Sequence, residues 1–176
     1  MIELRTAEDM AAWADATAAK GLRIGFVPTM GYLHAGHAAN MDLVRPRVDK
    51  LVVSIYVNPL QFGPGEDLDS YPRDLEADRR LCQAHGVDAI FTPADLYPDG
   101  FRTLVQVNGL SDGLCGASRP AFFPGITTVC TRLFNLTRCS VTSFGEKDYQ
   151  QLAIIRGLVQ DLGLRLQVLG CPIARE

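Results

Sequence analysis

His34 and His37 are the residues of this chain whose types and spacing best fit chemistry. They stand in the tetrad HAGH at 34–37, which follows an apolar run at residues 24–27, the turn residues PTMG at 28–31 and the dipeptide YL at 32–33. A strand, a glycine turn and a helix N-terminus in this order form a binding site for an anion. We therefore expect both imidazoles to donate hydrogen bonds to phosphate oxygens, while backbone N–H groups of the turn hold the rest of the anion.

A metal site is the alternative use of two close histidines. Zinc-binding pairs on a helix usually stand four residues apart, with a glutamate between them. Here the spacing is three, Gly36 lies between the pair, and the only other histidine is His85. Phosphate contact is therefore the better hypothesis, and two surface histidines at a helix cap are the remaining alternative.

Two further polar segments follow apolar runs. Asn58 and Gln61 come after residues 50–57. The second segment comes after residues 139–142 and contains Gly145, Glu146, Lys147, Asp148 and Gln151. Amides both donate and accept hydrogen bonds, so Asn58 and Gln61 fit a small hydroxylated or carboxylated substrate; hydrogen bonds that stabilise the loop are the alternative. Lys147 stands where a helix begins, and the helix dipole makes this an unfavourable place for a structural cation. Phosphate binding would explain why a lysine stands there, and plain solvation of its charge would explain it equally well.

The segments between these residues alternate between helix-like and strand-like apolar patterns. Helices are expected at residues 7–20, 38–48, 74–85, 125–136 and 147–162. Strands are expected at residues 23–28, 50–57, 88–91, 139–142 and 165–169, with a hairpin strand at 103–107. This order predicts an α/β, Rossmann-like fold: a doubly wound, mostly parallel sheet with helices on both faces. Ligands of such sheets bind at the carboxyl ends of the strands, so the three polar segments should meet in one crevice.

Composition excludes several classes of function. The net charge of −3 gives no overall attraction to nucleic acid or membranes, and no segment approaches the roughly 18 continuous apolar residues of a membrane span. The five cysteines are odd in number and lack CxxC spacing, which indicates reduced thiols in a cytoplasmic protein. A length of 176 residues fits one domain. Small molecules are therefore the expected partners.

The absence of other nucleotide-binding patterns narrows the chemistry. The sequence contains no GxxxxGK[ST], and no GxGxxG follows a strand. The sequence shows no nucleophile positioned by a base, so covalent catalysis is not favoured. Catalysis by positioning the substrates and stabilising charge in the transition state is the better hypothesis. A substrate carboxylate could attack the α-phosphate of a nucleotide, with His37 and Lys147 stabilising the transition state. Asp78 is a weak candidate for helping to hold a magnesium ion that bridges the phosphates.

Four long motifs, in order, resemble the pantothenate synthetase family of the HxGH nucleotidyltransferase superfamily. They are PTMGYLHAGH at 28–37, VSIYVNPLQFGPGEDLDSYPR at 53–73, GASRP at 116–120 and FGEKDYQQLAIIR at 144–156. The resemblance implies a ligase that joins pantoate and β-alanine. ATP and pantoate give pantoyl adenylate and pyrophosphate, and the β-alanine amine then displaces AMP. It also implies use of Mg²⁺ and a homodimer.

The resemblance further implies roles for individual residues. Pantoate, and β-alanine after it, would be held by Gln61 and Gln151, with Asn58 nearby. Catalysis would fall to His37, His34 and Lys147. The residues expected to bind ATP are Met30, Gly31, His34, Gly36, His37, Gly145, Glu146, Lys147, Asp148 and Ala174.

Three departures from the family pattern carry expectations of their own. The chain ends at Glu176, before the family's SSRN-type motif and its smaller C-terminal domain, so we expect one nucleotide-binding domain over residues 1–176 with impaired turnover. Phe122 and Pro124 replace polar or cationic residues, and Cys115 replaces a glutamate. These changes bear on substrate specificity. They leave open a catalytically inactive ATP- and pantoate-binding module, or a divergent paralogue.

Overall fold

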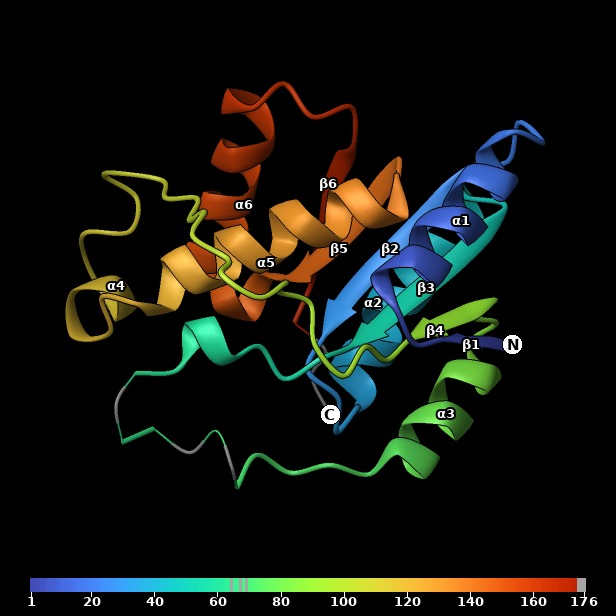
Figure 1. Ribbon diagram of the computed structural model, residues 1–176, viewed down its shortest axis with the longest axis horizontal. Coiled ribbons are helices and arrows are strands. Elements are labelled where there is room, and N and C mark those ends of the chain that lie inside the picture. The colour runs from blue at the N-terminus through green and yellow to red at the C-terminus, as the bar shows by residue number, and fades with distance from the viewer. Residues whose placement is uncertain (64, 67, 69, 174–176) are drawn as a thin grey trace.

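Six parallel strands form one sheet in this computed structural model, which describes residues 1–63, 65, 66, 68 and 70–173 (Figure 1). The strands lie in the order β1-β4-β3-β2-β5-β6, and each neighbouring pair is parallel. Their bounds are β1 Ile2–Leu4, β2 Ile24–Thr29, β3 Lys50–Ile55, β4 Ala89–Phe91, β5 Val141–Gly145 and β6 Gln167–Cys171. The predicted parallel sheet is confirmed.

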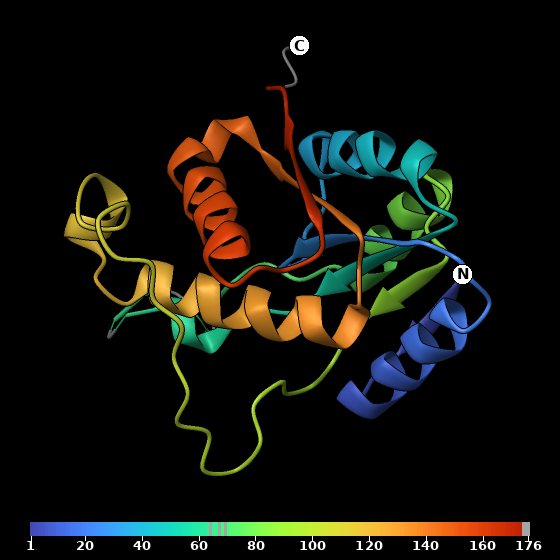
Figure 2. The ribbon, with the colours of Figure 1, turned by 90° about the horizontal axis from the view of Figure 1, so that it is seen from above.

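Helices cover both faces of the sheet, as predicted (Figure 2). They are α1 Ala7–Ala18, α2 Ala35–Val44, α3 Leu75–Ala84, α4 Cys115–Ser118, α5 Phe122–Thr137 and α6 Tyr149–Asp161. Three short 3₁₀ turns accompany them: η1 Arg45–Arg47, η2 Pro59–Gln61 and η3 Glu146–Asp148. Among the described residues, no helix is long and apolar enough to cross a membrane.

Alternate residues of the central strands point into two apolar cores. In β3, Val52 packs in the core that contains residues of α1, α5 and α6, while Leu51 and Val53 pack in the core that contains residues of α2 and α3. Phe26 and Val27 of β2 divide in the same way. Burial on both faces explains why these strands are continuous apolar runs in the sequence.

The direction of strand order changes between β2 and β5. From β2 the chain builds β3 and β4 on one side, and β5 and β6 on the other. Ligands bind at such a switch point, outside the carboxyl ends of the strands. The carboxyl ends of β2 and β5 carry the HAGH turn and the GEKD residues, so this topology positions the candidate site.

The prediction of a hairpin strand at residues 103–107 is wrong. The backbone N–H of Val105 donates to Oγ1 of Thr128 at 2.9 Å, and its carbonyl accepts from Thr127, so the segment bonds to hydroxyls of α5 instead of a strand. Sequence reasoning also missed β1, which is only three residues long and pairs at the edge with β4. Three residues are too few to show an alternating pattern.

Candidate active site

The two histidines of the HAGH turn cap their own helix. His34 is the N-cap of α2, and its Nδ1 accepts the N–H of Gly36 at 3.0 Å. Nδ1 of His37 accepts the N–H of His34 at 3.3 Å, and the two rings are 4.2 Å apart. Because α2 is capped this way, it begins at Ala35, three residues before the predicted start. Since both Nδ1 atoms accept, the N–H that either ring can offer to a ligand is the one on Nε2.

His37 is neutral at physiological pH. Burial, followed by the nearby charge of His34, lowers the pKa of His37 to about 4. An imidazole with this pKa donates its Nε2–H without carrying a positive charge. The ring lines the inner crevice described below, so it can offer this donor to a ligand there.

The turn before α2 uses its backbone N–H groups inside the protein. Gly31 donates to Oγ1 of Thr29 at 3.2 Å. Tyr32 and Leu33 donate to the two carboxylate oxygens of Asp78, at 3.0 and 2.7 Å. The expectation that these N–H groups hold a phosphate is therefore wrong, because polar side chains of the protein already accept from them.

Asn58 holds the amide of Gln61 in one orientation. Its Nδ2 donates to Oε1 of Gln61 and to the carbonyl of Gly125, both at 3.1 Å. Its Oδ1 accepts from the N–H of Leu60 at 3.3 Å and from the hydroxyl of Tyr97 at 2.8 Å. All four hydrogen-bonding positions of this buried amide are thus used within the protein, which is the loop-stabilising alternative. The amide nitrogen of Gln61 donates to Sδ of Met30 at 3.1 Å.

Helix α5 presses against the loop that carries these amides. A Cβ at Gly125 would lie 2.4 Å from the carbonyl oxygen of Leu60 and 2.5 Å from the backbone nitrogen of Gln61. Only a glycine allows an approach this close. The sequence therefore has Gly125 at the position where the helix supports Gln61.

The three polar segments meet in an inner crevice of about 220 Å³. Its polar lining consists of Thr29, His37, Asn58, Gln61, Asp148 and Gln151, together with the hydroxyl-bearing rings of Tyr56 and Tyr71. Its apolar lining includes Met30, Ile126, Val129, Leu133 and Phe144. The predicted convergence at one sheet edge is confirmed. The size and lining of the crevice fit a small acyl group with polar substituents.

An outer cavity of about 760 Å³ adjoins the crevice. The two share the lining residues Met30, Gln61, Tyr71, Asp148 and Gln151. Lys147 lines only the outer cavity and His37 only the inner crevice, so the two predicted catalytic groups border adjoining spaces.

The GEKD residues divide between the outer cavity and the edge strand. Lys147 and Asp148 line the cavity, whereas Oε1 of Glu146 lies 3.0 Å from the position of a Cβ on Gly170 in β6. Gly145 pairs with Cys171. The predicted helix start at Lys147 is wrong, because residues 146–148 form η3 and α6 begins at Tyr149. Lys147 therefore precedes the helix by two residues and still lies at the positive end of the helix dipole.

Other predicted residues lie outside these two spaces. Gly31 lines a neighbouring cavity of about 260 Å³, while neither His34 nor Gly36 borders any of these three cavities. Ala174 lies outside the described residues.

Comparison with known proteins agrees with this geometry. The family model of pantoate-beta-alanine ligase matches residues 3–176.

The chain belongs to the pantoate-beta-alanine ligase family.

Individual relatives match nearly the whole chain. It is 53% identical over 175 residues to pantothenate synthetase of Heliobacterium modesticaldum, and 54% identical over 171 residues to that of Geotalea daltonii. These matches cover 98% and 96% of this chain, but 62% and 61% of the relatives. The chain thus spans about three fifths of the length of these curated relatives.

Solved structures of the family show the same fold. The crystal structure of pantothenate synthetase from Thermus thermophilus has a TM-score of 0.92 at 48% identity, covering 100% of this chain and 63% of that one. Pantoate-beta-alanine ligase from Francisella tularensis, complexed with beta-gamma ATP and beta-alanine, has a TM-score of 0.94 at 35% identity. This match covers 100% of this chain and 68% of the Francisella chain.

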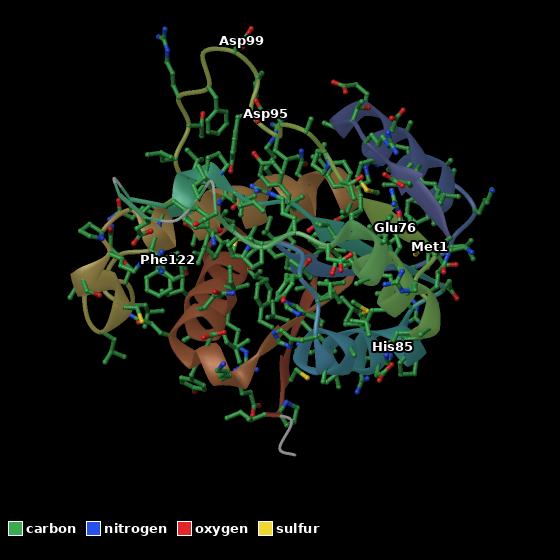
Figure 3. The ribbon with its side chains drawn as sticks, turned by 90° about the horizontal axis from the view of Figure 1, so that it is seen from below. Met1, Glu76, His85, Asp95, Asp99 and Phe122 are labelled. Carbon is green, nitrogen blue, oxygen red and sulfur yellow. The ribbon has the colours of Figure 1, made fainter. Side chains whose placement is uncertain are left out.

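Two of the three positions that are expected to depart from the ligase family pattern line the outer cavity. They are Cys115, which is exposed, and Phe122, whose position at the start of α5 is labelled in Figure 3. Pro124 borders neither the crevice nor the outer cavity, and lines a small separate cavity of about 160 Å³.

Arg119 organises this part of the outer cavity, and sequence reasoning gave it no role of its own. Its guanidinium donates to both carboxylate oxygens of Glu66 at 2.7 Å and lies 3.9 Å from the ring centroid of Phe122. The hydrogen bond from Arg119 is the main reason that the pKa of Glu66 falls to about 2. The only sequence signal for Arg119 is its place in the GASRP motif.

The described residues do not build a magnesium site. Within residues 1–63, 65, 66, 68 and 70–173, no group of three or more His, Cys, Asp or Glu side chains could hold a metal ion. Asp78 is only 2% exposed, and each of its oxygens already accepts a backbone N–H. In this geometry the carboxylate of Asp78 holds the backbone of Tyr32 and Leu33, in place of the predicted contact with magnesium.

Proposed function

We propose that this chain binds ATP and pantoate at the switch-point crevice and forms pantoyl adenylate, from which β-alanine displaces AMP to give pantothenate, a precursor of coenzyme A. The observation that carries this proposal is the inner crevice, where neutral His37 and the oriented amide of Gln61 line one space of about 220 Å³. The Francisella ligase, solved with beta-gamma ATP and beta-alanine, supports the assignment of ligands.

In the first step a carboxylate oxygen of pantoate attacks the α-phosphorus of ATP. A P–O bond forms, the bond to pyrophosphate breaks, and no protein group becomes covalently attached. Gln61 and Gln151 would orient the carboxylate and hydroxyls of pantoate. His37 would donate its Nε2–H to a phosphate oxygen as negative charge builds there, and Lys147 would neutralise the departing phosphates.

In the second step the β-alanine nitrogen attacks the acyl carbon. The bond to AMP breaks, and the amine loses a proton to solvent. The outer cavity of about 760 Å³ opens beside the crevice and gives the amine a route to the acyl group. We place Asn58 in a supporting role, because its hydrogen bonds are used to hold Gln61.

Magnesium would enter with the phosphates of ATP, neutralising charge on them. Since the described side chains do not form a ligand set for it, no step is assigned to the ion. The homodimer rests on the family resemblance, and the cytoplasmic location rests on the five cysteines, which are odd in number and lack CxxC spacing.

A binding module without turnover is the second candidate. The observation in its favour is that Phe122 and Cys115 line the outer cavity, at positions where the family resemblance implies polar residues. It predicts binding of ATP and pantoate without formation of the adenylate.

Two measurements test the proposal. Titration calorimetry with ATP, with and without pantoate, measures binding, and mass spectrometry together with pyrophosphate release detects pantoyl adenylate. Gln61→Ala should abolish the effect of pantoate, whereas Gln167→Ala, on the exposed edge strand β6, should not change it. Binding without adenylate would favour the module, and failure to bind either ligand would reject both candidates.

A further inference from the structure

The turn before α2 has the backbone shape of an anion-binding nest. Tyr32 has a positive φ of 53°, and its N–H and that of Leu33 after it both point to one side of the turn, where they donate to a single carboxylate. Successive N–H groups of such a turn point into one concavity, which binds anions. In this chain the concavity holds an anion of the protein itself, because Asp78 accepts from both Tyr32 and Leu33.

The fit around this carboxylate is tight. Asp78 lies on α3, 46 residues from Tyr32 in sequence, and is 2% exposed. A Cβ at Gly31 would lie 3.1 Å from Oδ2 of Asp78 and 2.9 Å from Cγ2 of Ile55. The turn is thus held between β3 and α3 with no room for a side chain at its first left-handed position.

The histidine pair starts directly after this turn. His34 caps α2 one residue beyond Leu33, and the N–H that it donates to His37 belongs to the same run of backbone. The position of the turn therefore sets the position of both rings. A displacement of about 1 Å in a catalytic group can lower a rate by about 10²-fold.

We propose that Asp78 is a positioning residue for adenylate formation: its carboxylate takes the place of a bound anion in the turn and thereby fixes His34 and His37. The catalytic consequence rests on the function proposed above, whereas the hydrogen bonds of the turn do not. Because the carboxylate of Asp78 already occupies the turn, the Nε2–H groups of the two imidazoles are the groups that would contact phosphate.

The first test replaces one carboxylate oxygen. Asp78→Asn puts an NH₂ group opposite an N–H of the turn, so the rate of adenylate formation at saturating ATP and pantoate should fall about tenfold or more, with KM values changed less than about threefold. Glu76→Gln is the matched control, because Glu76 lies on the same helix with its side chain 70% exposed (Figure 3). Equal rates for both variants and the unaltered chain would contradict the proposal.

Chemical rescue separates an anion requirement from general damage to the fold. Asp78 borders the cavity of about 260 Å³, so Asp78→Ala opens a path by which formate can reach the nest. Formate should restore most of the lost rate in Asp78→Ala, and chloride at equal ionic strength should not. A folded Asp78→Ala protein that formate does not restore would overturn the proposal.

A third test uses the unaltered chain, so its result does not depend on whether a variant folds. The amide protons of Tyr32 and Leu33 should exchange slowly and resonate downfield, because both donate to a carboxylate. Exchange at the rate of free amides would reject the nest directly. If the unaltered chain forms no adenylate while these two amides are protected, the proposed function fails and the positioning of the turn by Asp78 stands.

Discussion

Asn58 and Gln61 form a side-chain pair in which one amide fixes the other: Nδ2 of Asn58 donates to Oε1 of Gln61 across 3.1 Å. A free glutamine amide can turn over and exchange its donor and acceptor ends. Here the acceptor end of Gln61 is engaged, and its nitrogen donates to Sδ of Met30, which leaves one N–H of the NH₂ group for a ligand in the crevice. In the proposed function, recognition of pantoate by Gln61 would therefore depend on Asn58, a residue that is itself only 1% exposed.

Asn58→Ala should weaken pantoate binding by about tenfold or more, since one lost oriented hydrogen bond is worth about 1.4 kcal/mol. It should also lower the free energy of unfolding by about 1–3 kcal/mol, because the carbonyl of Gly125 and the hydroxyl of Tyr97 lose a buried partner. Calorimetry and urea denaturation measure the two effects. Asn135→Ala, at an exposed position of α5, should change neither. Unchanged pantoate affinity in Asn58→Ala would show that Gln61 needs no support.

His37→Ala should lower the rate of adenylate formation by about 10²–10³-fold, while ATP affinity falls less than about tenfold. The reason is that its neutral Nε2–H strengthens as charge builds on the phosphate. Single-turnover kinetics and calorimetry separate the two quantities. His85→Ala is the control, because His85 pairs with Asp42 on the other side of the molecule from Phe122 (Figure 3). Equal losses in rate and affinity would assign His37 to ground-state binding.

Stability should fall as the pH drops below the ordinary histidine pKa of 6.5. In the folded chain the pKa of His37 is lowered to about 4, so the unfolded chain takes up a proton between these values that the folded chain refuses. Protonation therefore favours unfolding across this window. Urea denaturation between about pH 7 and about pH 5 should show a smaller loss of stability for His37→Gln than for the unaltered chain. Identical pH dependence in both proteins would argue against a neutral, buried His37.

Lys147→Ala should weaken ATP binding by about tenfold, and added salt should shrink the difference because Lys147 is exposed. Lys147→Arg should keep part of the affinity, since the charge remains but the geometry of its donors differs. Titrations at low and high salt measure this. Lys20→Ala, just after α1, provides the matched loss of charge. A salt-independent loss would indicate that Lys147 acts by shape instead of charge.

Gly125→Ala should lower the free energy of unfolding by about 1–3 kcal/mol and impair pantoate binding, because the new Cβ meets the backbone of Leu60 and Gln61. Gly157→Ala is a helical control with room for the added carbon, whose nearest neighbour would be Leu110 at 3.4 Å. That control should be neutral or slightly stabilising. Thermal unfolding and calorimetry compare the pair. Equal behaviour of the two variants would contradict the close approach of α5 to the loop.

The sequence predicts those parts of the fold that are encoded by a local pattern of apolar and polar residues. The buried strand β3 was visible because it is apolar on both faces, and the edge where the site lies followed from strand order. The convergence of the HAGH, Asn58–Gln61 and GEKD segments could be expected from topology alone. The strand β1 could not, because its three residues carry too short a pattern.

The contacts that were missed join residues far apart in the chain. Asp78 bonds to a turn 45 and 46 residues away, and Tyr97 reaches Asn58 across 39 residues. Nothing in the local sequence marks either partner, so the sequence alone predicts that Asp78 helps to hold magnesium and that the turn holds a phosphate. Both interpretations assumed polar groups that were free, whereas folding had already paired them.

The crevice joins segments from the first and last thirds of the chain, since Pro28 and Gln151 line the same space. During synthesis on the ribosome, this space cannot exist until α6 has emerged and docked. A molecule that fits this crevice binds the folded chain, because a partly synthesised chain has no such site. At about a hundred times its dissociation constant, such a molecule adds about 2.7 kcal/mol to the free energy of unfolding. Pantoate and ATP would thus stabilise only those chains in which α6 has already docked.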